Sequence, residues 1–259
     1  MKEVYLKIKR QDSPQSRPYW EEFRVPFKQK MNVISLLLEI QKNPVNAKGQ
    51  QTTPVIWDCN CLEEVCGACT MIINGTARQA CAALVEDLKQ PVVLQPLTKF
   101  PIVRDLMVDR QKMFVNLKRI KAWIPIDGTY YLGPGPKVSP RVQEECYPIS
   151  CCMTCGCCME ACPYVNPKTN YMGPAAMAQV KLFNSHPTGA MYKDERLDII
   201  SGDGGLADCG NAQNCERVCP KQIPLVSIIA ELNRETALRG FTRWLKGKPR
   251  TFAHNLPSG

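Results

Sequence analysis

Residues 152–163 read CMTCGCCMEACP, and this stretch decides the fold of the second half of the chain. Its frame is C-x2-C-x2-C-x3-C-P, with cysteines at Cys152, Cys155, Cys158 and Cys162 before Pro163. In proteins with two iron–sulfur clusters, the first three cysteines of such a run bind one cubane cluster and the fourth binds the other. The stretch therefore predicts two neighbouring iron–sulfur centres.

The same frame returns at residues 209–220, CGNAQNCERVCP, with Ala212 where the middle cysteine would stand. The first centre then takes four thiolates and is expected to be a 4Fe–4S cluster bound by Cys152, Cys155, Cys158 and Cys219. The second has only Cys162, Cys209 and Cys215, so we expect a 3Fe–4S cluster that lacks one iron. Pro163 and Pro220 are each expected to turn the chain away and begin a helix, because the first turn of a helix tolerates proline.

A third cysteine cluster lies earlier, where residues 61–69 read CLEEVCGAC. The C-x4-C-x2-C spacing is typical of plant-type 2Fe–2S proteins. With the later Cys81 it predicts a 2Fe–2S cluster on Cys61, Cys66, Cys69 and Cys81. Gly67 is expected to let the backbone approach the sulfides. A structural zinc site on the same thiolates is the alternative, although the uneven spacing fits zinc poorly.

Four further cysteines have no place in these frames: Cys59, Cys146, Cys151 and Cys157. Cys59 is expected to be a bystander. We expect the other three to be free buried thiols. A ligand set shifted by one residue, with Cys151 or Cys157, remains an alternative.

The composition agrees with metal chemistry and excludes other classes. The 259 residues include 15 Cys but only 2 His, and carry a net charge of +9. An odd cysteine count without an export signal argues against a disulfide framework. No apolar run approaches the ~18–20 residues of a membrane span, so we expect a soluble, cytoplasmic chain. The charge alone would suit a zinc-binding nucleic-acid module, but the paired motifs are more specific, and no nucleic-acid partner is expected.

Hydrophobic patterning predicts β structure in the first hundred residues. Residues 4–8 and 23–27 alternate as half-buried strands, and Asn32 is expected to cap a helix whose apolar face uses Ile34, Leu37 and Leu38. Asn74-Gly75 favours a type I′ hairpin. We place a domain boundary near residue 108, giving domains 1–108 and 109–259.

Beyond that boundary the pattern is helical. Met113, Leu117, Ile120 and Ile124 share one helix face. Further helices are expected over 174–183 and 193–200, and from Pro224 onward. Residues 133–136, GPGP, indicate an exposed loop.

Four stretches together resemble the iron–sulfur subunits of succinate dehydrogenase and quinol:fumarate reductase. They are WDCNCLEEVCGAC at 57–69, CMTCGCCMEACP at 152–163, NYMGPAAM at 170–177 and DCGNAQNCERVCPK at 208–221. RQDSP, NPVNAKG, AWIPIDGTY and LFNSHPTGAM are most similar to the menaquinone-linked, Bacillus-like branch. The resemblance covers nearly the whole chain.

This resemblance implies an α+β fold, with an N-terminal β-grasp 2Fe–2S ferredoxin domain and a C-terminal all-α ferredoxin-like domain. It implies a subunit of succinate dehydrogenase (quinone), with FAD on a flavoprotein partner and a membrane-anchor cytochrome b that often carries haem b. Electrons would pass through the 2Fe–2S, 4Fe–4S and 3Fe–4S clusters to quinone. The chain would sit peripherally on the cytoplasmic face of the bacterial membrane.

The residues near the quinone are where this chain departs from its ubiquinone-linked relatives. Those place tryptophan shortly after the Cys-Pro and histidine after the next cluster cysteine. Here the corresponding residues are Pro163, Tyr164, Asn166 and Gly210. They are candidate quinone neighbours, with ordinary packing or capping as the alternative. The departure favours menaquinone, or a site built mostly by the anchor.

Three readings of function remain beside the main one. In the first, the chain is the same subunit in an enzyme that works mainly as a quinol:fumarate reductase. Reduction potentials and the quinone used, rather than the sequence, decide whether succinate is oxidised or fumarate is reduced. A free polyferredoxin would not need the 3Fe–4S pattern. A thiol:fumarate reductase would need further cysteine-rich repeats. No residue pattern suggests a catalytic nucleophile or a dinucleotide fingerprint, so we expect electron transfer rather than bond chemistry. Residues 231–259 carry a local surplus of Lys and Arg, either a solvated face or a contact with anionic lipid headgroups.

Overall fold

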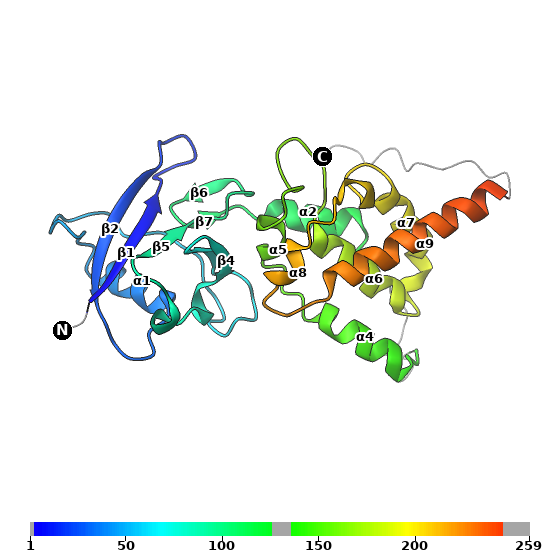
Figure 1. The fold of residues 1–259 in the computed structure, drawn as a ribbon, viewed down its shortest axis with the longest axis horizontal. Coiled ribbons are helices and arrows are strands. Elements are labelled where there is room, and N and C mark those ends of the chain that lie inside the picture. Colours follow the sequence, from blue (N-terminus) through cyan, green and yellow to red (C-terminus); the bar gives the residue numbers. More distant parts are fainter. Residues whose placement is uncertain (1–2, 126–135, 246–259) are drawn as a thin grey trace. The chain divides into compact units, whose positions relative to one another are not determined.

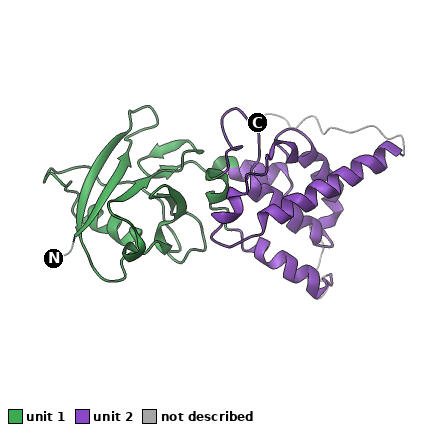
Figure 2. Ribbon diagram, viewed as in Figure 1, with its two compact units in different colours: residues 1–112, 153–161 green, residues 113–152, 162–259 purple. Residues whose placement is uncertain are grey.

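The computed structural model describes residues 3–125 and 136–245. The chain falls into two compact units, one of residues 1–112 with 153–161 and one of residues 113–152 with 162–259 (Figure 2). The predicted domain boundary at residue 108 stays a prediction. The two units cannot be separated by a single cut in the chain, because the first unit also includes segment 153–161.

A five-stranded sheet forms the first unit, in the order β2-β1-β5-β3-β4 (Figure 1). The strands are β1 (Glu3–Arg10), β2 (Tyr19–Pro26), β3 (Thr70–Ile73), β4 (Thr76–Gln79) and β5 (Val92–Gln95). β1 and β5 are parallel, and the other neighbours are antiparallel. A two-stranded ribbon of β6 (Ile102–Arg104) and β7 (Met107–Val108) and the short helices η1 (Ala80–Ala82) and η2 (Val85–Asp87) belong to the same unit.

The predicted alternation along β1 and β2 is confirmed. Leu6 of β1 pairs with Phe23 of β2, and both side chains are buried. Alternate residues of an edge pair face one core in this way because the side-chain period of a strand is two.

Helix α1 (Val33–Lys42) contributes the other half of this core. The Asn32 side chain accepts a hydrogen bond from the Ser35 N–H at 2.9 Å, which confirms the predicted cap. Ile34 and Leu37 are buried as expected. Leu38 is not: it is 42% exposed, and Leu36 is buried in its place.

The hairpin of β3 and β4 has the predicted turn. Asn74 and Gly75 have φ of 48° and 83°, and positive φ at both positions defines a type I′ turn. This turn directs β4 back along β3, so that Gln79 lies opposite Thr70.

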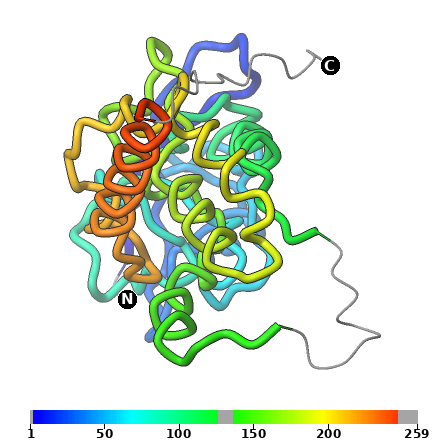
Figure 3. Tube along the Cα trace, turned by 90° about the vertical axis from the view of Figure 1, so that its right-hand side faces the viewer, coloured from blue at the N-terminus to red at the C-terminus, as the bar shows by residue number. Residues whose placement is uncertain are grey.

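Helices form the second unit, whose longest element is α9 (Leu225–Leu245). α6 (Pro174–Ser185) runs beside it in both views (Figures 1 and 3). Among the described residues, this unit also contains α2 (Gln111–Arg119), α4 (Pro140–Ser150), η3 (Gly189–Tyr192), α7 (Lys193–Ser201), η4 (Leu206–Asp208) and α8 (Asn214–Arg217). The predicted helices over 174–183, over 193–200 and beyond Pro224 are confirmed.

Two expectations for the helical half are wrong, and a third falls partly outside the residues that the structure describes. Ile124 lies beyond the end of α2 and is 38% exposed, because the chain leaves the helix after Arg119. Pro163 and Pro220 lie in turns, and neither begins a helix. Of the predicted GPGP loop, residues 133–135 lie outside the described residues. Within the described part of the chain, no helix is both long and apolar enough to cross a membrane.

Candidate iron–sulfur centres

The loop of residues 61–69 wraps its backbone N–H groups around two sulfurs. Cys61 Sγ accepts from the N–H groups of Glu63, Val65 and Cys66 at 3.3–3.4 Å. Cys66 Sγ accepts from those of Cys61 and Ala68 at 3.5 and 3.4 Å. The N–H groups of Glu63 and Val65 are the main cause that lowers the pKa of Cys61 to about 7. Such donors stabilise thiolates, the form that binds iron.

The other two candidate ligands of the 2Fe–2S cluster, Cys69 and Cys81, lie together and are more deeply buried. Cys69 Sγ and Cys81 Sγ are 3.4 Å apart, and both residues are buried. Burial raises the pKa of Cys69 to about 12. Cys59 is exposed and makes no sulfur contact of this kind among the described residues.

Gly67 also has a packing role that the sequence did not indicate. Its φ is +69°, and a Cβ there would lie 2.8 Å from Cys155 Cα and 3.1 Å from the Met153 carbonyl oxygen. The glycine therefore lets the first ligand loop pack on residues 153–155, and its expected approach to sulfides stays a prediction.

The side chain of Arg110 binds the backbone of the same loop. Its guanidinium donates to the carbonyl oxygens of Gly67 and Ala68, while its Nε is buried without a hydrogen-bond partner among the described residues. Burial lowers the pKa of Arg110, and the Asp58 carboxylate, followed by the thiols of Cys155 and Cys69, lies within electrostatic range. A positive charge thus lies beside cysteines of two predicted ligand sets.

Segment 153–161 brings two ligands of the second motif into the first unit. Cys155 and Cys158 are buried, and Glu160, at the end of α5 (Cys157–Glu160), accepts hydrogen bonds from Thr98 and Lys99. Cys157 is a fully buried thiol, as expected, and Gln79 donates to its sulfur at 3.4 Å. A hydrogen bond from Cys157 is the main cause that lowers the pKa of Cys155 to about 7.

Cys152 and Cys219, which complete the predicted 4Fe–4S set, belong to the second unit. Cys219 Sγ accepts from the Ile223 N–H at 3.5 Å. Cys146 and Cys151 are only half-buried. Within residues 3–125 and 136–245, no three His, Cys, Asp or Glu side chains converge as they would around a single metal ion. The complete ligand sets therefore stay predictions.

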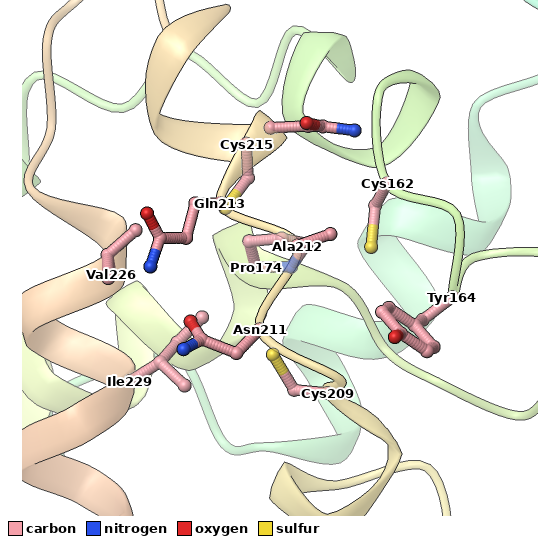
Figure 4. A pocket seen from close by; sticks show the side chains of 11 residues that line it. Cys162, Tyr164, Pro174, Cys209, Asn211, Ala212, Gln213, Cys215, Val226 and Ile229 are labelled. Atoms are coloured by element: carbon pink, nitrogen blue, oxygen red, sulfur yellow. The ribbon is translucent and has the colours of Figure 1, made fainter.

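Cys162, Cys209 and Cys215 line one pocket of the second unit (Figure 4). Their sulfurs point toward its middle, and Ala212 lies among them. Cys209 and Cys215 are placed by a loop in which Asn211 and Gln213 have positive φ, and Pro174, Val226 and Ile229 close the apolar side. Burial raises the pKa of Cys215 to about 11. Three thiols and one methyl group therefore line the same pocket.

The predicted quinone neighbours do not share one environment. Tyr164 lines this pocket, and its hydroxyl donates to the Gly210 carbonyl oxygen at 3.3 Å. A Cβ on Gly210 would fall 1.9 Å from the Tyr164 ring, so only glycine permits this contact. The Asn166 side chain makes hydrogen bonds within its own turn. It donates to the Pro163 carbonyl oxygen and accepts from the Lys168 N–H.

Sequence reasoning missed the polar side chains around the sulfurs. Arg110, Gln79 and Tyr171 belong to no cysteine motif, and each acts on residues far away in sequence. Tyr171 is fully buried, and its hydroxyl has no hydrogen-bond partner among the described residues. Only NYMGPAAM, which contains Tyr171, carried a signal, as part of a family resemblance.

Two domain models match the chain. One, described as a 2Fe-2S iron-sulfur cluster binding domain, matches residues 5–115, and a second, described as a 4Fe-4S dicluster domain, matches residues 148–223. These matches confirm the predicted fold class and replace the zinc alternatives in both halves.

The relatives agree with the domain models. The chain is 60% identical over 240 residues to the succinate dehydrogenase iron-sulfur subunit of Bacillus subtilis, which covers 93% of this chain and 95% of that protein. It is 28% identical over 223 residues to the fumarate reductase iron-sulfur subunit of Wolinella succinogenes, covering 85% of this chain and 90% of that one.

A solved structure supports the fold. A chain of the Mycobacterium smegmatis Sdh1 complex in the apo form matches with a TM-score of 0.73 and 23% identity, over 92% of this chain and 97% of that chain. Because both cluster-binding domains are matched in this order, and because the 60% identity extends over nearly the whole length, the chain belongs to the family of succinate dehydrogenase iron–sulfur subunits, whose role is electron transfer.

Proposed function

We propose that this chain is the electron-transfer subunit of a succinate:quinone oxidoreductase, and that its last centre is a 3Fe–4S cluster held by Cys162, Cys209 and Cys215. The observation that carries the proposal is the pocket in which these three cysteines surround Ala212. A cluster with three protein thiolates lacks the ligand that a fourth iron would need. The buried Tyr171 hydroxyl without a partner also fits a site meant for a group rich in sulfur acceptors.

The first loop would hold a 2Fe–2S cluster through two pairs of sulfurs. In such a cluster each iron takes two cysteine thiolates. Cys61 and Cys66 are linked through shared backbone donors, and Cys69 lies against Cys81. We assign one pair to each iron. The N–H groups on Cys61 and Cys66 would stabilise the more negative, reduced state.

The 4Fe–4S cluster would take Cys152, Cys155, Cys158 and Cys219. The close packing of Gly67 on Cys155 supports direct electron transfer between this centre and the 2Fe–2S centre. Arg110, beside both loops, would favour the reduced form of each through its charge.

When bound, the clusters would supply one-electron chemistry that links the FAD of a flavoprotein partner to quinone at a membrane anchor. The chain's own residues exclude water, hold the thiolates and donate hydrogen bonds to sulfur. The anchor would be a cytochrome b, with haem b, on the cytoplasmic face of the membrane. We place Tyr164, which contacts Gly210, nearest the quinone. Menaquinone is the acceptor that we propose.

Fumarate reduction is the second candidate direction, because iron–sulfur subunits of fumarate reductases are 28% identical to this chain. The 60% relative, a succinate dehydrogenase subunit, favours succinate oxidation.

Ala212→Cys tests the proposal. We expect the added thiolate to convert the last centre toward 4Fe–4S. The near-isotropic low-temperature EPR signal of the oxidised complex would be lost, and quinone reduction would slow.

Ala212→Val is the matched control, since it adds bulk without a ligand. It should keep the oxidised signal. An Ala212→Cys complex with unchanged cluster type and rate would contradict the ligand assignment.

A further inference from the structure

Tyr171 is a buried polar side chain that the ligand assignment leaves unexplained. It lies before α6, is 0% exposed, and its hydroxyl makes no hydrogen bond to another described residue. Buried tyrosine hydroxyls almost always have a partner. The missing partner is therefore expected to be a group that occupies the site in the loaded protein.

The backbone around Tyr171 holds the ring in place. The Met172 N–H donates to Gly204 O at 2.9 Å, and Asn116 donates to Met172 O at 2.9 Å. Asn170 donates to the Asp203 carboxylate at 2.8 Å. These contacts hold the chain on both sides of Tyr171, whose side chain is fully buried.

Three cysteine thiols interact electrostatically with the hydroxyl. Among the thiols, that of Cys209 interacts with it most strongly, followed by those of Cys162 and Cys215. Burial, followed by these cysteines, raises the pKa of Tyr171. A tyrosine already keeps its proton at neutral pH, so toward a negatively charged sulfur the hydroxyl acts as a donor.

We propose that the Tyr171 hydroxyl donates a hydrogen bond to a sulfur of the centre held by Cys162, Cys209 and Cys215, on the Cys209 side, and thereby raises its reduction potential. The inference rests on the proposed function. The step is a one-electron reduction by the preceding 4Fe–4S centre, in which no bond breaks and Tyr171 keeps its proton. The hydrogen bond is stronger in the reduced state, because that state carries one more negative charge.

Tyr171→Phe removes the hydroxyl and keeps the ring. We expect the ratio of reduced to oxidised 3Fe–4S centre at a fixed potential to fall about tenfold, which is about 59 mV for one electron. The measurement is a redox titration of the purified complex, followed by EPR. The 2Fe–2S potential of the same sample should stay unchanged.

Tyr164→Phe is the matched control, because Tyr164 lines the pocket of the three cysteines but its hydroxyl bonds to the Gly210 carbonyl. It should shift the potential much less. An unchanged potential in Tyr171→Phe, or an equal shift in Tyr164→Phe, would overturn the assignment.

Two further arms separate the possible failures. A wild-type complex without a 3Fe–4S signal would refute the proposed function itself, before any potentials are compared. If Tyr171→Phe does not retain the centre, 3-fluorotyrosine placed at position 171 alone gives a stronger donor of nearly the same size. It should raise the potential, and no change would count against the hydrogen bond.

Discussion

Gly67 and Arg110 fix the backbone of the first ligand loop between Cys66 and Cys69. Gly67 leaves room for Cys155, and Arg110 binds the two carbonyl oxygens that follow Cys66. Neither residue binds iron in our assignment, yet both decide where the thiolates lie.

Replacing Gly67 with alanine should destabilise the holo chain. Its φ of +69° strains an L residue, and the new Cβ would overlap Cys155. Together these effects cost about 2–5 kcal/mol. We expect a lower melting temperature by calorimetry and a weaker 2Fe–2S signal.

Gly75→Ala is the control, since Gly75 also has positive φ but open space around its Cβ position. Only the strain of about 1–2 kcal/mol applies there. Equal losses in the two variants would show that contact with Cys155 is unimportant.

The cysteine ligands could be proposed from sequence because their spacing is local and specific. Gln79, Arg110 and Tyr171 could not, because their partners lie far away in the chain and a lone polar residue has no motif. Gly67 was singled out for its flexibility, but the group it approaches depends on tertiary packing.

At the scale of elements, periodicity identified most strands and helices but not always the buried face. In α1, the run Leu36-Leu37-Leu38 offers three apolar residues in a row, and only contact with the sheet decides that Leu36 is buried and Leu38 exposed. The Asn32 cap and the Asn74-Gly75 turn were predictable, because each depends on the chemistry of adjacent residues.

Helix α9 is tied to α7 by an ion-pair cluster that sequence alone does not indicate. Asp198 of α7 accepts from Arg239 and Arg243, one turn apart on α9, at 2.5–3.2 Å. All three side chains are less than a third exposed. Burial alone would raise the pKa of Asp198, but hydrogen bonds from the two arginines outweigh it and lower the pKa.

Acid should therefore loosen the C-terminal half of α9. A carboxyl with a depressed pKa stabilises the fold above its unfolded pKa, about 3.9. That contribution is lost as the pH falls through the lower, folded value. Asp198→Asn should cost about 1–3 kcal/mol at neutral pH. Hydrogen exchange of the amides of residues 236–245 measures both effects.

Asp194→Asn provides the comparison. Asp194 also pairs with Arg239, but it is 82% exposed, so solvent screens the pair. Exchange should change little in this variant. If Asp194→Asn accelerated exchange as much as Asp198→Asn, the burial of Asp198 would not explain the effect.

For the whole molecule, the order of motifs along the chain predicted the two kinds of domain but not the course of residues 153–161. This segment packs in the first unit, although its sequence belongs to the second cysteine motif. The contacts responsible, Glu160 with Thr98 and Gly67 with Cys155, join residues more than sixty positions apart. Such pairs leave no pattern in a single sequence.

The central claim is that three cysteines around Ala212 hold a 3Fe–4S cluster at the end of a chain of three centres. Low-temperature EPR of the membrane-extracted complex, as isolated and then reduced, tests it most directly. We predict a near-isotropic signal in the oxidised sample that disappears on mild reduction, followed by growth of a rhombic 2Fe–2S signal. A silent oxidised sample whose last centre titrates as a second 4Fe–4S cluster would contradict the account.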